Sequence, residues 1–161
     1  MKKFIIIGFV AIFISSINAQ KLQLTEAATQ YKNNLSPMWM MQPDQLQQNK
    51  AVLVKAKKAI DESYAKQMSS PILKEKDLTK MYYYRGMIYL DYAMMAAMDE
   101  ELKANVESIP EEQLENASFG SLKKCMELDT KKQWNNYINN KVQKLRVPSF
   151  NSGLESLIFQ F

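Results

Sequence analysis

The sequence of 161 residues contains no histidine and a single cysteine, Cys125. Histidine is the commonest general base and the commonest metal ligand in proteins, so its absence removes the usual parts of many active sites. One cysteine cannot form a disulfide within the chain, and the fold must therefore be held by packing alone. Cys125 lies in LKKCMELD, on the apolar stripe of an expected helix, which predicts a small buried hydrophobe rather than a reactive thiol.

Glycine and proline are also scarce, with four and five residues respectively. Alternating runs of β-branched residues, which are typical of strands, do not occur after the first twenty residues. Alanine, leucine, methionine, lysine, glutamine and glutamate make up much of the chain, and these residues are good helix formers. We therefore predict an all-α protein.

The N-terminus has the pattern of a targeting segment. Lys2 and Lys3 precede an apolar run at positions 4–14, and the segment SSINA ends in the small residue Ala19. This order is typical of a secretory signal peptide, here residues 1–19, and predicts an exported protein, periplasmic or extracellular. An uncleaved N-terminal anchor is the alternative, because Ile17 is not an ideal residue at the third position before the cut. No later stretch approaches the ~20 apolar residues of a transmembrane helix.

The charge of the mature chain is close to balanced. Without Lys2 and Lys3, the 21 basic residues become 19 against 17 acidic ones, a net charge of +2. A nucleic-acid-binding stripe needs a larger excess of positive charge, so we expect no nucleic-acid partner.

Turn residues and capping signals divide residues 20–161 into about six helices. The expected helical ranges are 22–34, 44–66 with Asp44 as N-cap, 77–105, 108–128, 130–147 and 149–161. Ser108 with Glu111, and Thr130 with Gln133, have the spacing of capping boxes, in which two side chains satisfy free amides at a helix start. The connections are short, which predicts antiparallel hairpins.

Two parts of the chain resemble each other. LTEAATQY and YYYRGMIY lie 58 residues apart, and each is followed by a lysine-rich helix, around Ala59 and Cys125. One helical unit therefore occurs twice, and we expect hairpins over residues 20–68 and 72–129. Residues 130–161 form either a third hairpin or the start of a further repeat that continues past Phe161.

YYYRGMIY followed by LKKCMELD resembles a tetratricopeptide repeat, with Tyr82, Gly86, Tyr89 and Cys125 as its packing seam. The resemblance implies a divergent exported protein of Gram-negative bacteria, a short solenoid of stacked hairpins and a concave surface that binds a protein or peptide. The chain departs from the repeat pattern at Arg85, where a leucine is expected, and in a connection about 20 residues longer than that of the usual ~34-residue repeat.

The stretch KMYYYRGMIYL contains the three consecutive tyrosines Tyr82, Tyr83 and Tyr84. Successive side chains of a helix point about 100° apart, so these three cannot form one stacking platform. We expect Tyr83 and Arg85 near the rim of the fold, and Tyr84 facing the preceding hairpin.

The sequence contains no recognisable arrangement of catalytic residues. No nucleophile elbow surrounds a serine, and the acidic residues, Asp91 and Asp99 among them, fall at expected helix ends and turns, where they should be solvated. We therefore expect a protein that is not an enzyme and that uses no cofactor.

The segment QWNNYINNK offers a candidate binding surface. Asn135 and Asn139 are one helical turn apart and Lys141 follows them, so the amides could clamp an extended peptide while the lysine takes a carboxylate. Together with Tyr92 they are the predicted partner contacts. A solvated polar face is the alternative interpretation.

Methionine supports a second functional class. Met94, Met95 and Met98 lie close together, Met95 and Met98 on one expected helix face, and Met38, Met40 and Met41 form another group. Thioethers can bind Cu(I) in an exported protein, which makes a small-ligand or copper binder the alternative function. Methionine that fills gaps between helices is the simpler interpretation. A third possibility is a structural helical module that only holds the domains of a larger chain.

Overall fold

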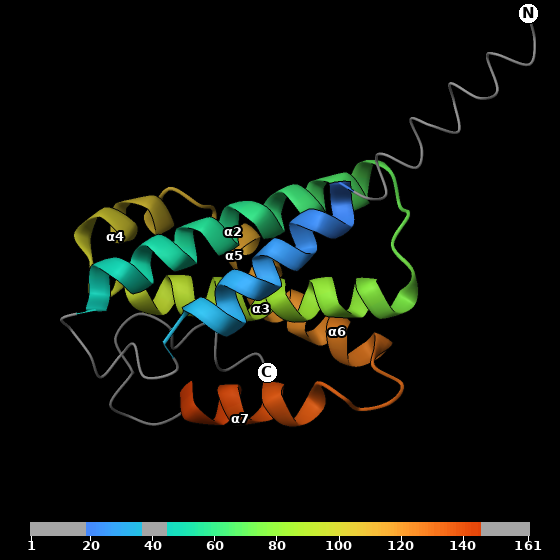
Figure 1. The fold of residues 1–161 in the computed structure, drawn as a ribbon. Coiled ribbons are helices and arrows are strands. Elements are labelled where there is room, and N and C mark those ends of the chain that lie inside the picture. The colour runs from blue at the N-terminus through green and yellow to red at the C-terminus, as the bar shows by residue number, and fades with distance from the viewer. Residues whose placement is uncertain (1–18, 37–44, 146–161) are drawn as a thin grey trace, which may run out of the picture.

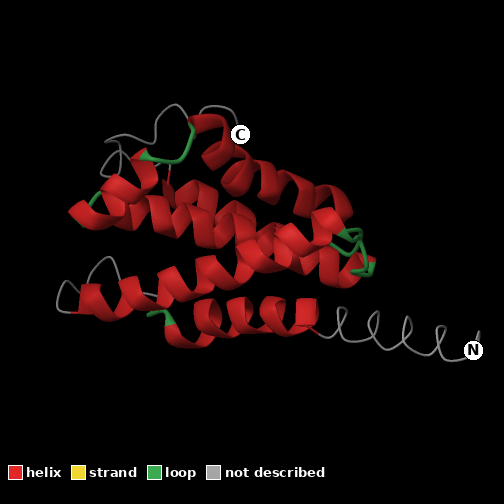
Figure 2. Cartoon of the chain, turned by 90° about the horizontal axis from the view of Figure 1, so that it is seen from above, coloured by secondary structure: helices red, strands yellow, loops and turns green. Residues whose placement is uncertain are grey.

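The computed structural model describes residues 19–36 and 45–145, and all regular structure in these ranges is helical (Figures 1 and 2). The predicted all-α class is thus confirmed. Several predictions fall outside the described residues: nearly all of the signal peptide, the Asp44 cap, the first methionine group and the last helix.

The chain is helical at residues 19–29 and continues into the π-helical turn η1 (Gln30–Asn34). The elements that follow are α2 (Leu46–Ser69), α3 (Glu75–Ala96), α4 (Glu100–Glu107), α5 (Glu111–Glu115), the π-helical turn η4 (Asn116–Gly120), α6 (Ser121–Leu128) and α7 (Asn135–Leu145). None of the helices in residues 19–36 and 45–145 is both long and apolar enough to cross a membrane.

Helix α3 is the centre of the fold. It packs against α2 on one side and against α6 and η4 on the other, and the helix of residues 19–34 lies along α2 (Figure 1). From Tyr83 to Ala96 nearly every side chain of α3 is buried. A helix that is enclosed on all sides needs apolar residues around its whole circumference, which explains the density of tyrosine and methionine in this segment.

A glycine allows α6 to approach α3 closely. A Cβ atom on Gly86 would lie only 2.5 Å from Leu122 Cδ2 and 2.9 Å from the Ser118 carbonyl oxygen. Gly86 is therefore a point of close approach between the two helices, and Leu122 occupies the space that a larger residue would need.

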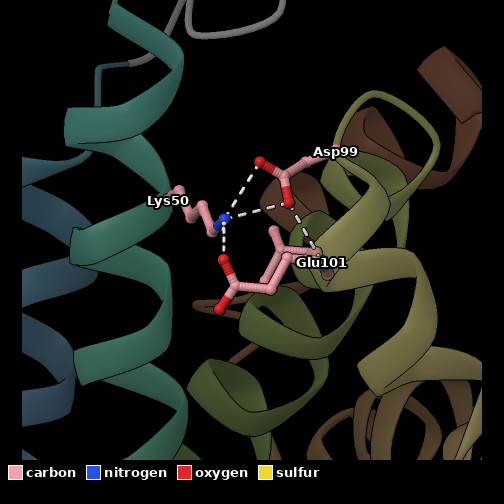
Figure 3. A network of polar contacts seen from close by, with 4 residues as sticks. Lys50, Asp99 and Glu101 are labelled. Carbon is pink, nitrogen blue, oxygen red and sulfur yellow. Dashed lines mark hydrogen bonds and ion pairs between the residues drawn. The ribbon is translucent and has the colours of Figure 1, made fainter.

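The predicted third helix, 77–105, is wrong at its C-terminal end. The structure breaks it after Ala96 and begins α4 at Glu100. Asp99 causes the break, because its Oδ1 atom accepts a hydrogen bond from the Leu102 amide at 3.0 Å and thereby caps α4. Lys50 of α2 holds this cap, with its Nζ atom 3.0 Å from Asp99 Oδ1 and 2.6 Å from Glu101 Oε2 (Figure 3).

Both predicted capping boxes are wrong. Ser108 ends α4 instead of starting the next helix, and its hydroxyl donates to the Asn105 carbonyl at 2.7 Å. Thr130 lies in the turn before α7, where the carboxylate of the preceding Asp129 accepts the Trp134 amide hydrogen bond at 2.6 Å. At the start of α7 the Asp129 carboxylate thus takes the acceptor role that was predicted for the Thr130 hydroxyl, because charge-assisted hydrogen bonds are the stronger ones.

Candidate functional site

Five aromatic rings from three distant parts of the chain surround a cavity of about 360 Å³, which we call the aromatic cleft. The rings belong to Tyr31, Tyr83, Tyr84, Trp134 and Tyr137. Lys32 and Gln133 complete the lining. The floor is buried, whereas the rim is open to solvent, and Tyr137 on the rim is 61% exposed. A concave apolar surface with a few polar groups is the usual form of a ligand site.

The rings of the cleft pack against one another in a continuous chain. Trp134 stacks on Tyr83 with ring centroids 4.2 Å apart and planes 29° apart. Tyr83 meets Tyr84 edge-on at 5.1 Å, and Tyr84 meets Tyr31 edge-on at 6.1 Å. Such pairs contribute about 0.5–1.5 kcal/mol each beyond the area they bury, so the cleft is preorganised before any ligand arrives.

A tight turn between α6 and α7 positions Trp134. Lys132 has a φ of 52°, in the left-handed region that non-glycine residues seldom adopt, and its amide donates to the Asp129 carbonyl at 3.0 Å. The Asp129 carboxylate also accepts a hydrogen bond from the Trp134 amide, so Asp129 fixes both ends of the turn. Backbone strain of about 1–3 kcal/mol is typical of such a position, and the surrounding contacts must offset it.

A buried carboxylate ties the aromatic cleft to α7. Asp91 is only 2% exposed, so the prediction that it is solvated is wrong. Its Oδ2 atom accepts a hydrogen bond from the Tyr31 hydroxyl at 2.5 Å, and its Oδ1 atom forms an ion pair with the Lys141 ammonium. Burial, and then the nearby Asp91 charge, raise the pKa of Tyr31, which keeps its hydroxyl a hydrogen-bond donor.

The hydroxyls of Tyr83 and Tyr84 are different from that of Tyr31. Neither hydroxyl makes a hydrogen bond with another residue in the described part of the chain. Burial raises the pKa of both phenols, so they stay protonated. Two donors without partners beside an aromatic floor can bind the carbonyl oxygens of a ligand.

The structure separates the predicted partner contacts. Asn139 is exposed on α7, and Asn135 is half-buried beside Trp134, with an Oδ1 atom that has no hydrogen-bond partner among the described residues. Lys141 is not a free clamp residue, because it is committed to Asp91 and its side chain is only 16% exposed. Tyr92 is buried and lines another cavity, of about 530 Å³, where the Lys57 ammonium lies 5.6 Å from its ring.

The residues of the predicted packing seam lie in the interior around α3. Gly86 and Cys125 are buried on the α6 side, and the Tyr89 hydroxyl reaches Asp61 of α2 at 2.8 Å. Tyr82 is only partly buried. Cys125 is fully buried, as predicted, and burial raises the pKa of its thiol to about 12.

Arg85 does not lie at the rim, and that prediction is wrong. It is 8% exposed, with its guanidinium carbon 3.7 Å from the Tyr64 ring centroid and its Nη1 atom 2.9 Å from the Ser121 hydroxyl. The cation–π contact compensates part of the cost of burying the charge. Tyr83 is also buried, whereas Tyr84 faces Tyr31 of the first hairpin, as predicted.

The methionine group does not form a common face. Met94 and Met95 are buried in the core, and Met98 lies beyond the end of α3, where it is 45% exposed. The expectation that Met95 and Met98 share a helix face is therefore wrong. Within residues 19–36 and 45–145, no group of three or more acidic or cysteine side chains has an arrangement that could hold a metal ion.

Comparisons with protein-family models, with curated proteins and with solved structures gave no match for this chain. Trp134, directly before α7, and Tyr137, in its first turn, were not predicted as site residues, although residues three apart at a helix start can lie on one side of it.

Proposed function

We propose that this protein is an exported, non-enzymatic binding protein of the cell envelope, and that its aromatic cleft takes a segment of another protein. The aromatic cleft itself carries the proposal. It combines a buried aromatic floor, an exposed rim and the two unpartnered hydroxyls of Tyr83 and Tyr84. Tyrosine and tryptophan are the residues that supply the most binding energy at protein interfaces, because they offer large area at little entropic cost.

The chemistry of the remaining residues supports binding rather than catalysis. The chain has no histidine, and its only thiol is buried, with a pKa raised to about 12. The resemblance of YYYRGMIY and LKKCMELD to a tetratricopeptide repeat agrees with a binding role. The signal-peptide pattern of residues 1–19 supports export.

Selection from a display library of random short peptides tests this function. Peptides enriched on the wild-type chain should lose at least about tenfold in affinity for Tyr137→Ala, since an interface aromatic commonly carries this much binding energy. Tyr137 is 61% exposed, so its removal should leave the melting temperature unchanged. Leu22→Ala is the matched control, because Leu22 is 68% exposed and does not line the aromatic cleft.

Enriched peptides that bind Tyr137→Ala as tightly as the wild type would contradict the proposed site. A selection that enriches nothing over an unrelated helical protein would contradict the proposed function itself.

A further inference from the structure

A second cavity lies next to the aromatic cleft. This polar cavity has a volume of about 340 Å³ and shares Gln133 and Trp134 with the aromatic cleft. Its other walls include Glu75, Lys76 and Thr79 of α3 and residues 128–131 of the turn after α6. Because they share Gln133 and Trp134, the two cavities are adjacent, and we call them together the groove. The α3 residues that line it lie between Glu75 and Tyr84.

Three lysines line this groove, and two more lie next to residues that line it. Lys32 lines the aromatic cleft, Lys76 and Lys131 line the polar cavity, and Lys80 lies 6.0 Å from the Tyr84 ring centroid. Lys132 follows in the same turn. None of these five ammonium groups is in an ion pair with another described residue.

The acidic residues of the groove do not balance these charges. Glu75 is exposed at the start of α3, whereas Asp129 is buried and committed to the Trp134 amide. Elsewhere in the described chain, Lys50, Lys57 and Lys124 have carboxylate partners. Five unpaired lysines around one groove therefore form a local concentration of positive charge on a chain that is otherwise nearly neutral.

We infer that the groove binds an extended acidic segment of a partner protein. An aromatic or proline side chain of that segment occupies the aromatic cleft, and its flanking carboxylates meet the lysines around the groove. This inference rests on the proposed function and adds the chemistry of the partner. Charge complementarity of this kind sets specificity and speeds association, whereas the aromatic contacts supply most of the affinity.

A single-stranded nucleic acid is also anionic, but the packing of the rings disfavours it. Base stacking needs free aromatic faces, and the face of Trp134 that points to Tyr83 is already covered at 4.2 Å. The edge-on contacts among Tyr31, Tyr83 and Tyr84 leave a corrugated floor rather than a flat platform. Such a floor accepts a compact side chain better than a stack of bases.

Three synthetic peptides with the same phenylalanine–proline–phenylalanine centre test the inference. Their flanks carry aspartates, serines or lysines, and binding to the full chain is measured by fluorescence anisotropy at low salt and at about 0.15 M salt. The acidic peptide should bind at least about tenfold more tightly than the serine peptide at low salt, and the difference should shrink as salt screens it. The lysine peptide should bind most weakly.

Reversing the charge of two lysines tests whether the groove causes the preference for the acidic peptide. Lys32→Glu with Lys131→Glu should abolish the advantage of the acidic peptide, because both ammonium groups line the groove and are exposed. Lys55→Glu with Lys58→Glu on α2 is the matched control, with the same change in net charge and the same exposure. The control pair should retain the preference.

The outcomes separate this inference from the proposed function. Equal binding of all three peptides, still sensitive to Tyr137→Ala, would overturn the acidic partner and leave the binding function intact. Binding of none of them would overturn both. Displacement of the acidic peptide by a thymidine oligonucleotide at equal concentration would overturn the inference in favour of a nucleic-acid ligand.

Discussion

Gly86 of α3 lies so close to Leu122 of α6 that a methyl group on the glycine would come within 2.5 Å of Leu122 Cδ2. Gly86→Ala should therefore lower the free energy of unfolding by about 1–2 kcal/mol. Overpacking costs about 1–3 kcal/mol, and the better helix propensity of alanine, about 1 kcal/mol, offsets part of it. Urea denaturation measures the difference.

Gly120 provides the control for this substitution. A Cβ atom there would lie 3.3 Å from Asn116 Oδ1, at the end of a side chain that can move. Gly120→Ala should be neutral or slightly stabilising, and equal destabilisation by both alanines would show that the close approach at Gly86 is not the cause.

The ion pair between Lys141 and Asp91 should determine how firmly α7 is attached. Lys141→Met removes the charge but keeps the length of the side chain, and leaves the Asp91 carboxylate buried with only the Tyr31 hydroxyl. Breaking one side of a buried pair costs about 3–5 kcal/mol. Denaturation of the single variants and of Lys141→Met with Asp91→Asn should show that the double change costs less than the sum. Additive losses would contradict the coupling.

Cys125 should react with a thiol reagent only when the fold opens. The residue is fully buried, and its pKa of about 12 reduces the thiolate fraction near pH 8 by on the order of 10³ relative to a free cysteine. Labelling in native buffer should therefore be far slower than in urea. Leu122→Ala, which loosens the neighbouring packing, should accelerate it, and rapid native labelling would contradict the burial of this thiol.

The acid sensitivity of the fold should depend in part on Asp99. The Leu102 amide and then the Lys50 ammonium hold the pKa of Asp99 below its usual value. Because the folded pKa lies below the unfolded one, the carboxylate stabilises the fold above pH ~3.9 and loses this contribution as the pH falls through the folded pKa. Asp99→Asn keeps a capping side chain without the charge. Its stability deficit at pH 7 should shrink in acid, and a constant deficit would contradict the assignment.

The helical class was predictable because each residue has an intrinsic helix propensity, and the composition of this chain favours residues with a high one. The positions at which the helices are interrupted were harder to predict from the sequence. The break at residues 97–99 contains neither glycine nor proline, and it depends on Lys50, which lies 49 residues away from Asp99. A capping aspartate followed by two glutamates was the local signal for α4.

The aromatic cleft was not predictable, because its parts become neighbours only through tertiary packing. Tyr82 and Tyr89 were predicted to pack in the interior, but Tyr83 was expected near the rim, and nothing local to it indicates that Trp134 stacks on it. The asparagines and Lys141 drew attention to α7 for a different reason, since their spacing suggested a clamp. Lys141 instead serves the interior, and only the buried charge of Asp91 explains why.

The walls of the aromatic cleft come from η1, from α3, and from the turn before α7 with the first turn of that helix, so no single segment of the chain contains the whole cleft. A partner that recognises only the assembled cleft binds the folded chain and not the unfolded one. At a partner concentration one hundred times the Kd, this linkage adds about 2.7 kcal/mol to the free energy of unfolding. The cellular abundance of the protein would then follow that of its partner, because the unaccompanied chain unfolds more often and is degraded sooner.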